Sequence, residues 1–162
     1  MSDVRVVQAG AEDAAAISEL ECRPENRPFV RGHAEAEHRA RMVDPSVRYL
    51  RIEDAGAFIG FALVTELGGS DRSARLLRIV MDTPGRGLGR PAMRAICDLV
   101  FDAWGAERLW LDVFEDNPRA RHLYESLGFH ATGHTHHPSH PRGDGGTAPL
   151  MRMELLADRA KP

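Results

Sequence analysis

The first half of the chain consists of short apolar runs of strand length set between turn residues. Alternating or continuous apolar runs indicate strands, whereas apolar residues that recur every three or four positions indicate helices. We predict an edge strand over 4–8, helices over 11–21 and 34–43, and strands over 47–53, 57–67 and 73–81. The segment 22–32 contains Pro24 and Pro28, which predicts irregular structure between the two helices.

The second half alternates helix and strand. From Met93 to Trp104 the apolar residues follow one helix face, and Gly105 comes directly after them. This pattern predicts an amphipathic helix that ends at the glycine. Asn117 and Pro118 are residue types favoured at the cap and first position of a helix. We predict a strand over 108–114, a helix over 117–128, a polar loop over 136–146, and strands over 129–135 and 150–156.

The order of these elements defines the expected fold class. Hairpins come first and crossover helices later, which favours an α/β (α+β) fold with a mixed central sheet. We expect about seven strands and about four helices, with helices on both faces. No repeat or linker divides the sequence, so we expect one domain over 1–162.

Composition and charge exclude several classes of function. The chain has 43% hydrophobic and 28% charged residues and a net charge of −3, which gives no basis for nucleic-acid binding. No apolar run has the length of a membrane span, and the N-terminus lacks the pattern of a secretory signal. Cys22 and Cys97 are far apart and have no metal-binding spacing. We therefore expect a cytoplasmic, reduced protein that binds neither nucleic acid nor membrane.

A glycine-rich turn, Gly85–Arg90, lies between a predicted buried strand and the amphipathic helix. Such a turn can present backbone N–H groups at a helix N-terminus to a pyrophosphate, and Arg86 and Arg90 add positive charge. It lacks the Lys-Ser/Thr of a nucleotide P-loop and the G-x-G-x-x-G spacing of a dinucleotide fold. On spacing alone, an ordinary strand-to-helix turn is an equally good reading.

A second motif runs from Trp110 to Phe129. Asn117 and Tyr124 lie seven residues apart, which is about two helical turns, so they share one helix face. Together they could border a polar channel beside the glycine turn. Taken singly, Asn117 could serve only as a cap and Tyr124 only as a core residue.

In their order, the two motifs resemble the GCN5-related N-acetyltransferase (GNAT) family. The glycine turn is similar to that family's acyl-CoA motif, [Gln/Arg]-x-x-Gly-x-Gly/Ala. The positions Asn117, Ala120, Leu123-Tyr124 and Gly128-Phe129 match its second motif. The resemblance covers residues 76–129. Within the family, 78–80 and 110–129 look most like bacterial ribosomal-protein-alanine and other protein N-terminal acetyltransferases.

The resemblance implies a site for acetyl-CoA as cosubstrate. Its pantetheine arm would lie between the strands 75–81 and 108–114, which would splay around it. Tyr124 would act as general acid on the departing sulfur. Backbone N–H groups near residue 80 would polarise the thioester carbonyl. The implied cofactor-binding residues are Ile79, Val80, Met81, Gly85, Arg86, Gly87, Leu88, Gly89, Arg90, Asn117, Ala120 and Tyr124.

The general base is assigned by the same resemblance. In the N-terminal acetylating relatives a glutamate stands five residues before the motif asparagine, and here that position is Asp112. We predict that Asp112 removes the proton from the amine through a water, with Glu115 and Glu66 as alternatives; an ordinary polar strand residue is an equal reading. Pro84 replaces the Gln/Arg of the first motif and removes one backbone donor.

The expected reaction is direct attack of a primary amine on acetyl-CoA in a ternary complex. The acceptor would be a peptide N-terminus or a small amine, and the family leads us to expect a homodimer. An alternative is a module that binds acyl-CoA without catalysis.

Histidines are concentrated near the C-terminus, where His130–His140 holds five of the eight in the chain. No cysteine or regular spacing accompanies them, so we predict a solvated loop without a metal. This loop and the segment 26–32 would shape the acceptor pocket. His33 and His38 are interpreted as surface or packing residues.

Overall fold

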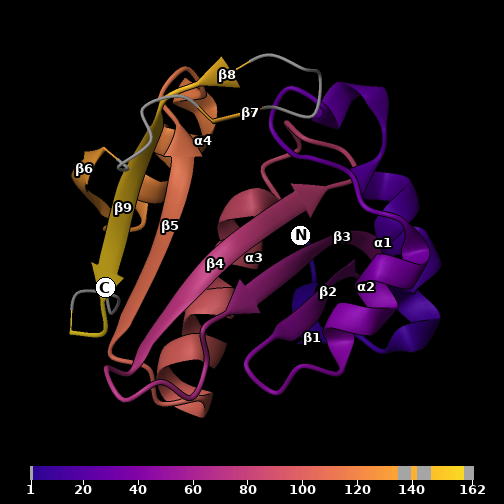
Figure 1. Ribbon diagram of the computed structural model, residues 1–162, viewed down its shortest axis with the longest axis horizontal. Coiled ribbons are helices and arrows are strands. Elements are labelled where there is room, and N and C mark those ends of the chain that lie inside the picture. Colours follow the sequence, from indigo (N-terminus) through magenta and orange to yellow (C-terminus); the bar gives the residue numbers. More distant parts are fainter. Residues whose placement is uncertain (1, 135–139, 142–146, 159–162) are drawn as a thin grey trace.

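The computed structural model describes residues 2–134, 140–141 and 147–158 (Figure 1). The N-terminal half forms a 3-10 turn at Ala11–Asp13, another at Pro24–Asn26, and six longer elements. These six are β1 (Val4–Gln8), α1 (Ala14–Glu21), α2 (Glu35–Met42), β2 (Arg48–Asp54), β3 (Ala57–Thr65) and β4 (Ser73–Met81).

The C-terminal half carries the crossover helices. The amphipathic helix α3 is followed directly by one π-helical turn at Leu99–Ala103, and Gly105 then takes a left-handed φ of 71°. The elements are α3 (Gly89–Asp98), β5 (Arg108–Phe114), α4 (Pro118–Ser126), β6 (His130–His134), β7 (His140–Pro141), β8 (Thr147–Ala148) and β9 (Leu150–Leu156).

The main sheet contains seven strands in the order β1-β2-β3-β4-β5-β9-β6. Neighbouring strands are antiparallel except at β4 and β5, which are parallel. That pairing is short, because only Ser73–Arg75 of β4 pair with Arg108–Trp110 of β5. Beyond these pairs the two strands separate, and Figure 1 shows them meeting at one end and diverging toward the other. The sheet therefore opens in its middle, between β4 and β5.

The two faces of the sheet have separate cores. On one face, α3 and α4 pack against β4, β5 and β9 in a cluster that includes Met93, Ile96, Leu111 and Tyr124. On the other face, Ile17 and Leu20 of α1 pack with Phe61 of β3 and other residues of β2–β4. Because side chains alternate along a strand, each strand residue faces only one of these cores.

The predicted fold class and element order are confirmed, with small differences at the boundaries. The strands 73–81 and 150–156 have the predicted bounds. The loop predicted over 136–146 is wrong at residues 140 and 141, which form β7 and pair with β8; its other residues lie outside the described part of the chain. None of the described helices combines the length and apolar composition that crossing a bilayer would require.

Candidate functional site

The glycine turn leaves β4 and leads directly into α3. Gly85 and Gly87 have φ values of 93° and 75°, a left-handed conformation that side chains with a Cβ rarely adopt. A Cβ on Gly87 would meet nothing within 4 Å, so the backbone there is open to a ligand. Arg86 and Arg90 are exposed on the turn, whereas the side chain of Leu88 is buried among Ile59 and Ala92. Any contact between Leu88 and a cofactor is therefore expected to come from its backbone.

The second motif packs directly against this turn. A Cβ on Gly85 would lie 3.0 Å from Nη2 of Arg119, and one on Gly89 would lie 3.4 Å from Cδ2 of Leu123. Both contacts come from α4, so the two motifs are neighbours in space. Arg119 brings a third guanidinium to the turn beside Arg86 and Arg90. Arg119 was not predicted as a site residue. A basic residue in the first turn of a helix, where the dipole disfavours a cation, is nevertheless a signal of a nearby anion.

Beside the turn, β4 ends in a segment with one free edge. Ile79, Val80 and Met81 pair with Ala62, Phe61 and Gly60 of β3. They have no pairing with β5, whose register with β4 ends at Arg75 and Trp110. Their backbone groups on the β5 side are therefore not used by the sheet, as the pantetheine prediction requires.

At the start of α4, Asn117 and Tyr124 take the local roles that the sequence left open. The Oδ1 atom of Asn117 accepts a hydrogen bond of 3.3 Å from the backbone N of Ala120, so the side chain caps the helix. Tyr124 is buried, with its ring 5.6 Å from that of Phe129. Burial raises the pKa of the Tyr124 hydroxyl to about 12. The phenol therefore keeps its proton throughout the neutral range.

Asp112 is engaged in an ion pair. Its two carboxylate oxygens accept from Nε and Nη2 of Arg152 at 2.9 and 3.1 Å, and Arg75 Nη2 lies at 3.5 Å. The guanidinium groups of Arg75 and Arg152 also stack over the ring of Trp110, at 4.7 and 4.1 Å. A role as base would require this carboxylate to receive a proton while Arg152 holds both of its oxygens.

The two alternative bases lie elsewhere. Glu66 follows β3 with a left-handed φ of 63°, and its charge contributes to raising the pKa of Arg152. Glu115 follows β5, and its backbone N donates to Pro149 O while its backbone O accepts from Arg121.

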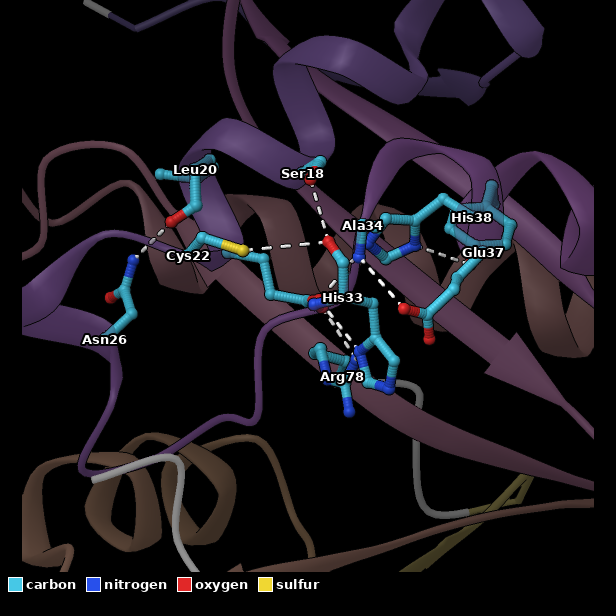
Figure 2. A network of polar contacts seen from close by, with 11 residues as sticks. Ser18, Leu20, Cys22, Asn26, His33, Ala34, Glu37, His38 and Arg78 are labelled. Carbon is cyan, nitrogen blue, oxygen red and sulfur yellow. Dashed lines mark hydrogen bonds and ion pairs between the residues drawn. The ribbon is translucent and has the colours of Figure 1, made fainter. Parts of the chain in front are cut away.

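A buried polar cluster on the α1/α2 face was not predicted. The carboxylate of Glu21 is fully buried and accepts from Arg78 Nη1 at 2.6 Å, from the backbone N of His33 at 2.7 Å and from His38 Nε2 at 3.1 Å. His33 Nδ1 lies 3.0 Å from the same carboxylate. His38 Nδ1 in turn contacts the hydroxyl of Tyr49 at 2.8 Å. Figure 2 shows His33 between α1 and Arg78 of β4.

The charge state of Glu21 follows from these contacts. Burial would raise the pKa of its carboxyl, but the hydrogen bond from His38, the charge of Arg78 and the hydrogen bond from His33 outweigh burial and lower the pKa to about 2. Glu21 is therefore an anion at neutral pH. The sequence did carry a signal for it, because Glu21 follows Ile17 and Leu20 on the apolar face of α1.

Comparison with known proteins agrees with this architecture. Residues 14–129 match the model of the acetyltransferase (GNAT) family. An uncharacterized N-acetyltransferase of Mycobacterium tuberculosis is 31% identical over 94 residues, 57% of this chain and 58% of that protein. Spermidine N(1)-acetyltransferase of Vibrio cholerae is 32% identical over 93 residues, 56% of this chain and 54% of that protein. The matched region thus spans less than two thirds of either relative.

Solved structures extend the likeness to the whole fold. The crystal structure of spermidine N-acetyltransferase from Vibrio cholerae in complex with CoA and spermine has a TM-score of 0.85 and 23% sequence identity to this chain, and covers 97% of both chains. At this identity the likeness concerns the fold alone. The family model, by contrast, spans most of the chain and contains both sequence motifs, and the chain therefore belongs to the GNAT family of acetyltransferases.

Proposed function

We propose that this chain is an N-acetyltransferase that moves the acetyl group of acetyl-CoA to the primary amine of a small molecule. The observation that carries the proposal is the meeting of the two motifs beside the free edge of β4. The turn at Gly85 and Gly87 lies against α4, and the segment 79–81 is unpaired on its β5 side.

The residues of the turn fit a pyrophosphate. The left-handed glycines leave the backbone accessible, and Arg86, Arg90 and Arg119 supply positive charge. A pyrophosphate at a helix N-terminus is favoured by the helix dipole and by unpaired N–H groups. We propose that Gly85–Arg90 hold the pyrophosphate and that Ile79–Met81 hold the arm. Asn117 and Ala120 would border the arm at the start of α4.

Bound acetyl-CoA would supply the thioester that the amine attacks. We propose that Tyr124 donates to the departing sulfur. An alkyl thiol such as that of cysteine ionises near 8.5, whereas the pKa of Tyr124 is about 12. The phenol thus holds its proton more tightly than a thiolate would. We expect its main contribution to be a hydrogen bond to the charge that develops on the sulfur as the C–S bond breaks.

The size of the expected Tyr124 effect follows from that role. A hydrogen bond to a charged group contributes about 1.5–3 kcal/mol, so Tyr124→Phe should lower kcat by about 10- to 100-fold. The dissociation constant of acetyl-CoA should stay nearly unchanged, because the bond forms only as charge develops. An unchanged kcat would remove Tyr124 from the chemistry.

The acceptor is proposed to be a small amine because the named relatives include polyamine acetyltransferases. The experiment is release of thiol from acetyl-CoA with a panel of polyamines, amino acids, amino sugars and short peptides. Amine-dependent release would support the enzyme and identify its acceptor class. Tight acetyl-CoA binding without release for any amine would favour a binding module. A preference for peptides would restore the N-terminal acetylation that the sequence also predicted.

A further inference from the structure

We propose that His33 is the general base that deprotonates the acceptor amine, with Glu21 orienting its ring. The inference rests on the proposed acetyl transfer and assigns its base to the α1/α2 face. It would replace the role that sequence gave to Asp112, whose carboxylate is held on both oxygens by Arg152.

His33 is fixed in place by its backbone as well as its ring. Its backbone N donates to Glu21 Oε1 at 2.7 Å. Its backbone O accepts from Ser18 Oγ at 2.7 Å and from Cys22 Sγ at 3.6 Å. Figure 2 shows the contacts of Ser18 and Cys22 with His33. A general base must be held within hydrogen-bond reach of the proton that it removes. The three backbone contacts of His33 fix the position of its side chain accordingly.

The charge of Glu21 selects the tautomer of His33. In the proposed tautomer, the Nδ1 atom of His33 carries the hydrogen and donates it to the anionic Glu21 carboxylate, 3.0 Å away. Arg78 Nη1 donates one of its two hydrogens to the other Glu21 oxygen at 2.6 Å, and it lies 3.2 Å from His33 Nδ1. The Nε2 atom then holds a free electron pair. A buried carboxylate that orients an imidazole and stabilises its cation is the arrangement of catalytic triads.

Position and exposure distinguish His33 from the rest of the cluster. The side chains of Glu21 and His38 are 0% and 1% exposed, whereas those of His33 and Arg78 are each 13% exposed. Arg78 directly precedes the β4 segment 79–81, whose free edge lines the opening between β4 and β5. His33 is thus the partly exposed histidine of the cluster, and its Nδ1 atom lies 3.2 Å from the residue that directly precedes this free edge.

The proposed step moves one proton from the acceptor ammonium to His33. An N–H bond of the acceptor ammonium breaks, an H–Nε2 bond forms, and His33 becomes an imidazolium beside the Glu21 carboxylate. The free amine attacks the thioester carbon, the C–S bond breaks, and sulfur leaves with the electron pair. The attacking nitrogen loses its second proton to water as the amide forms, and the thiolate takes up a proton. His33 then returns its proton to water. The charged or titratable groups that face this cation are Glu21 on α1, His38 on α2, Tyr49 on β2 and Arg78 on β4, with Arg41 beside Tyr49.

Glu21, His33 and His38 also have the composition of a metal site. The guanidinium of Arg78 argues against one, because its Nη1 atom lies 2.6 Å from the carboxylate and 3.2 Å from His33 Nδ1. This cation already neutralises Glu21 at the place that a metal would take. The positive charge of Arg78 would also repel a metal cation bound there.

The test compares wild type, His33→Gln and the exposed-residue control His122→Gln in steady-state transfer to an accepted amine between pH 6 and 9. Glutamine retains an N–H for Glu21 but cannot take a proton. We expect His33→Gln to lower kcat/KM for the amine by about 100-fold or more at pH 7. The defect should shrink as pH rises, because an amine that is already neutral needs no base. Free imidazole should partly restore His33→Ala, and acetyl-CoA affinity should be unchanged in both variants.

Three results would overturn the inference. A defect in His33→Gln that is the same at every pH, with correct folding and acetyl-CoA binding, would show a structural role. Stoichiometric zinc in the purified protein would replace the base with a metal centre. A wild type that releases no thiol with any amine would remove the proposed function itself, and the inference with it; that failure is distinguishable because it appears before any substitution is made.

Discussion

The buried carboxylate of Glu21 makes a quantitative prediction about stability and pH. Its pKa is lowered from 4.5 to about 2 in the folded chain. This difference in pKa corresponds to about 3 kcal/mol of stabilisation. Because the folded pKa lies below the unfolded one, this stabilisation is fully present above about pH 5 and is lost as pH falls toward 2. Glu21→Gln removes the ionisation and leaves the donors from Arg78, His33 and His38 facing a neutral amide.

The expected signature is a cost of substitution that depends on pH. Removing one partner of a buried ion pair costs about 3–5 kcal/mol, so Glu21→Gln should destabilise the protein by about 3 kcal/mol at pH 7. At pH 3 the wild type should itself have lost about 2 kcal/mol of the Glu21 contribution. The difference between the two proteins should therefore narrow by about 2 kcal/mol from pH 7 to pH 3.

Urea unfolding followed by circular dichroism measures this difference at each pH. Glu25→Gln is the matched control, because it makes the same chemical change at an exposed position. It should change stability by less than about 0.5 kcal/mol at every pH. If the cost of Glu21→Gln stayed constant between pH 7 and pH 3, Glu21 would be titrating normally in the folded state, and the account of its charge would be wrong.

Three further predictions concern the acetyl-CoA side of the sheet and its ion pair. Gly87 and Gly68 both have a left-handed φ, and a Cβ on either would meet nothing within 4 Å. Gly87→Ala and Gly68→Ala therefore introduce the same backbone strain, and Gly68→Ala serves as the control. Calorimetry should show acetyl-CoA affinity falling at least about tenfold for Gly87→Ala, because its backbone must approach phosphate, and no change for Gly68→Ala. Asn117→Ala should lower the unfolding free energy by about 1 kcal/mol through loss of the cap, measured by denaturation. If Asp112 serves only its ion pair, Asp112→Asn and Arg152→Gln should lower kcat to the same extent. A much larger, pH-dependent loss of kcat in Asp112→Asn alone would instead support Asp112 as the base.

Local structure was predictable where local chemistry determines it. Asn117 and Pro118 have the residue types of a helix start, and α4 begins there. The strand 73–81 combines a long apolar run with turn residues at both ends, and its bounds match the structure. The positive φ of Gly105 after the amphipathic helix likewise follows from residue type.

Contacts between distant segments could not be predicted in the same way. The sequence gives no register that places β9 between β5 and β6, and this placement puts Arg152 beside Asp112, 40 residues away. A register shift on β4 near Leu76 also changes which side chains face α1, and Arg78 points there as a result. The Glu21 cluster forms only where four segments meet, namely α1, residues 33–42, β2 and β4. Patterns within a single segment therefore gave only the weak signal of an acid on an apolar helix face.

The opening between β4 and β5 connects the two halves of the proposed chemistry. Tyr124 lies in the core of the α3/α4 face, together with Leu111 of β5. His33 contacts Arg78 on the α1/α2 face of β4. The proposed proton donor and the proposed base thus lie on opposite faces of the sheet, and the reacting atoms can reach both only where β4 and β5 have separated. Under the proposed roles, acetyl-CoA would bind on the α3/α4 side and the amine on the α1/α2 side. Two substrates that enter from opposite faces can occupy the site together, which is the condition for direct attack in a ternary complex.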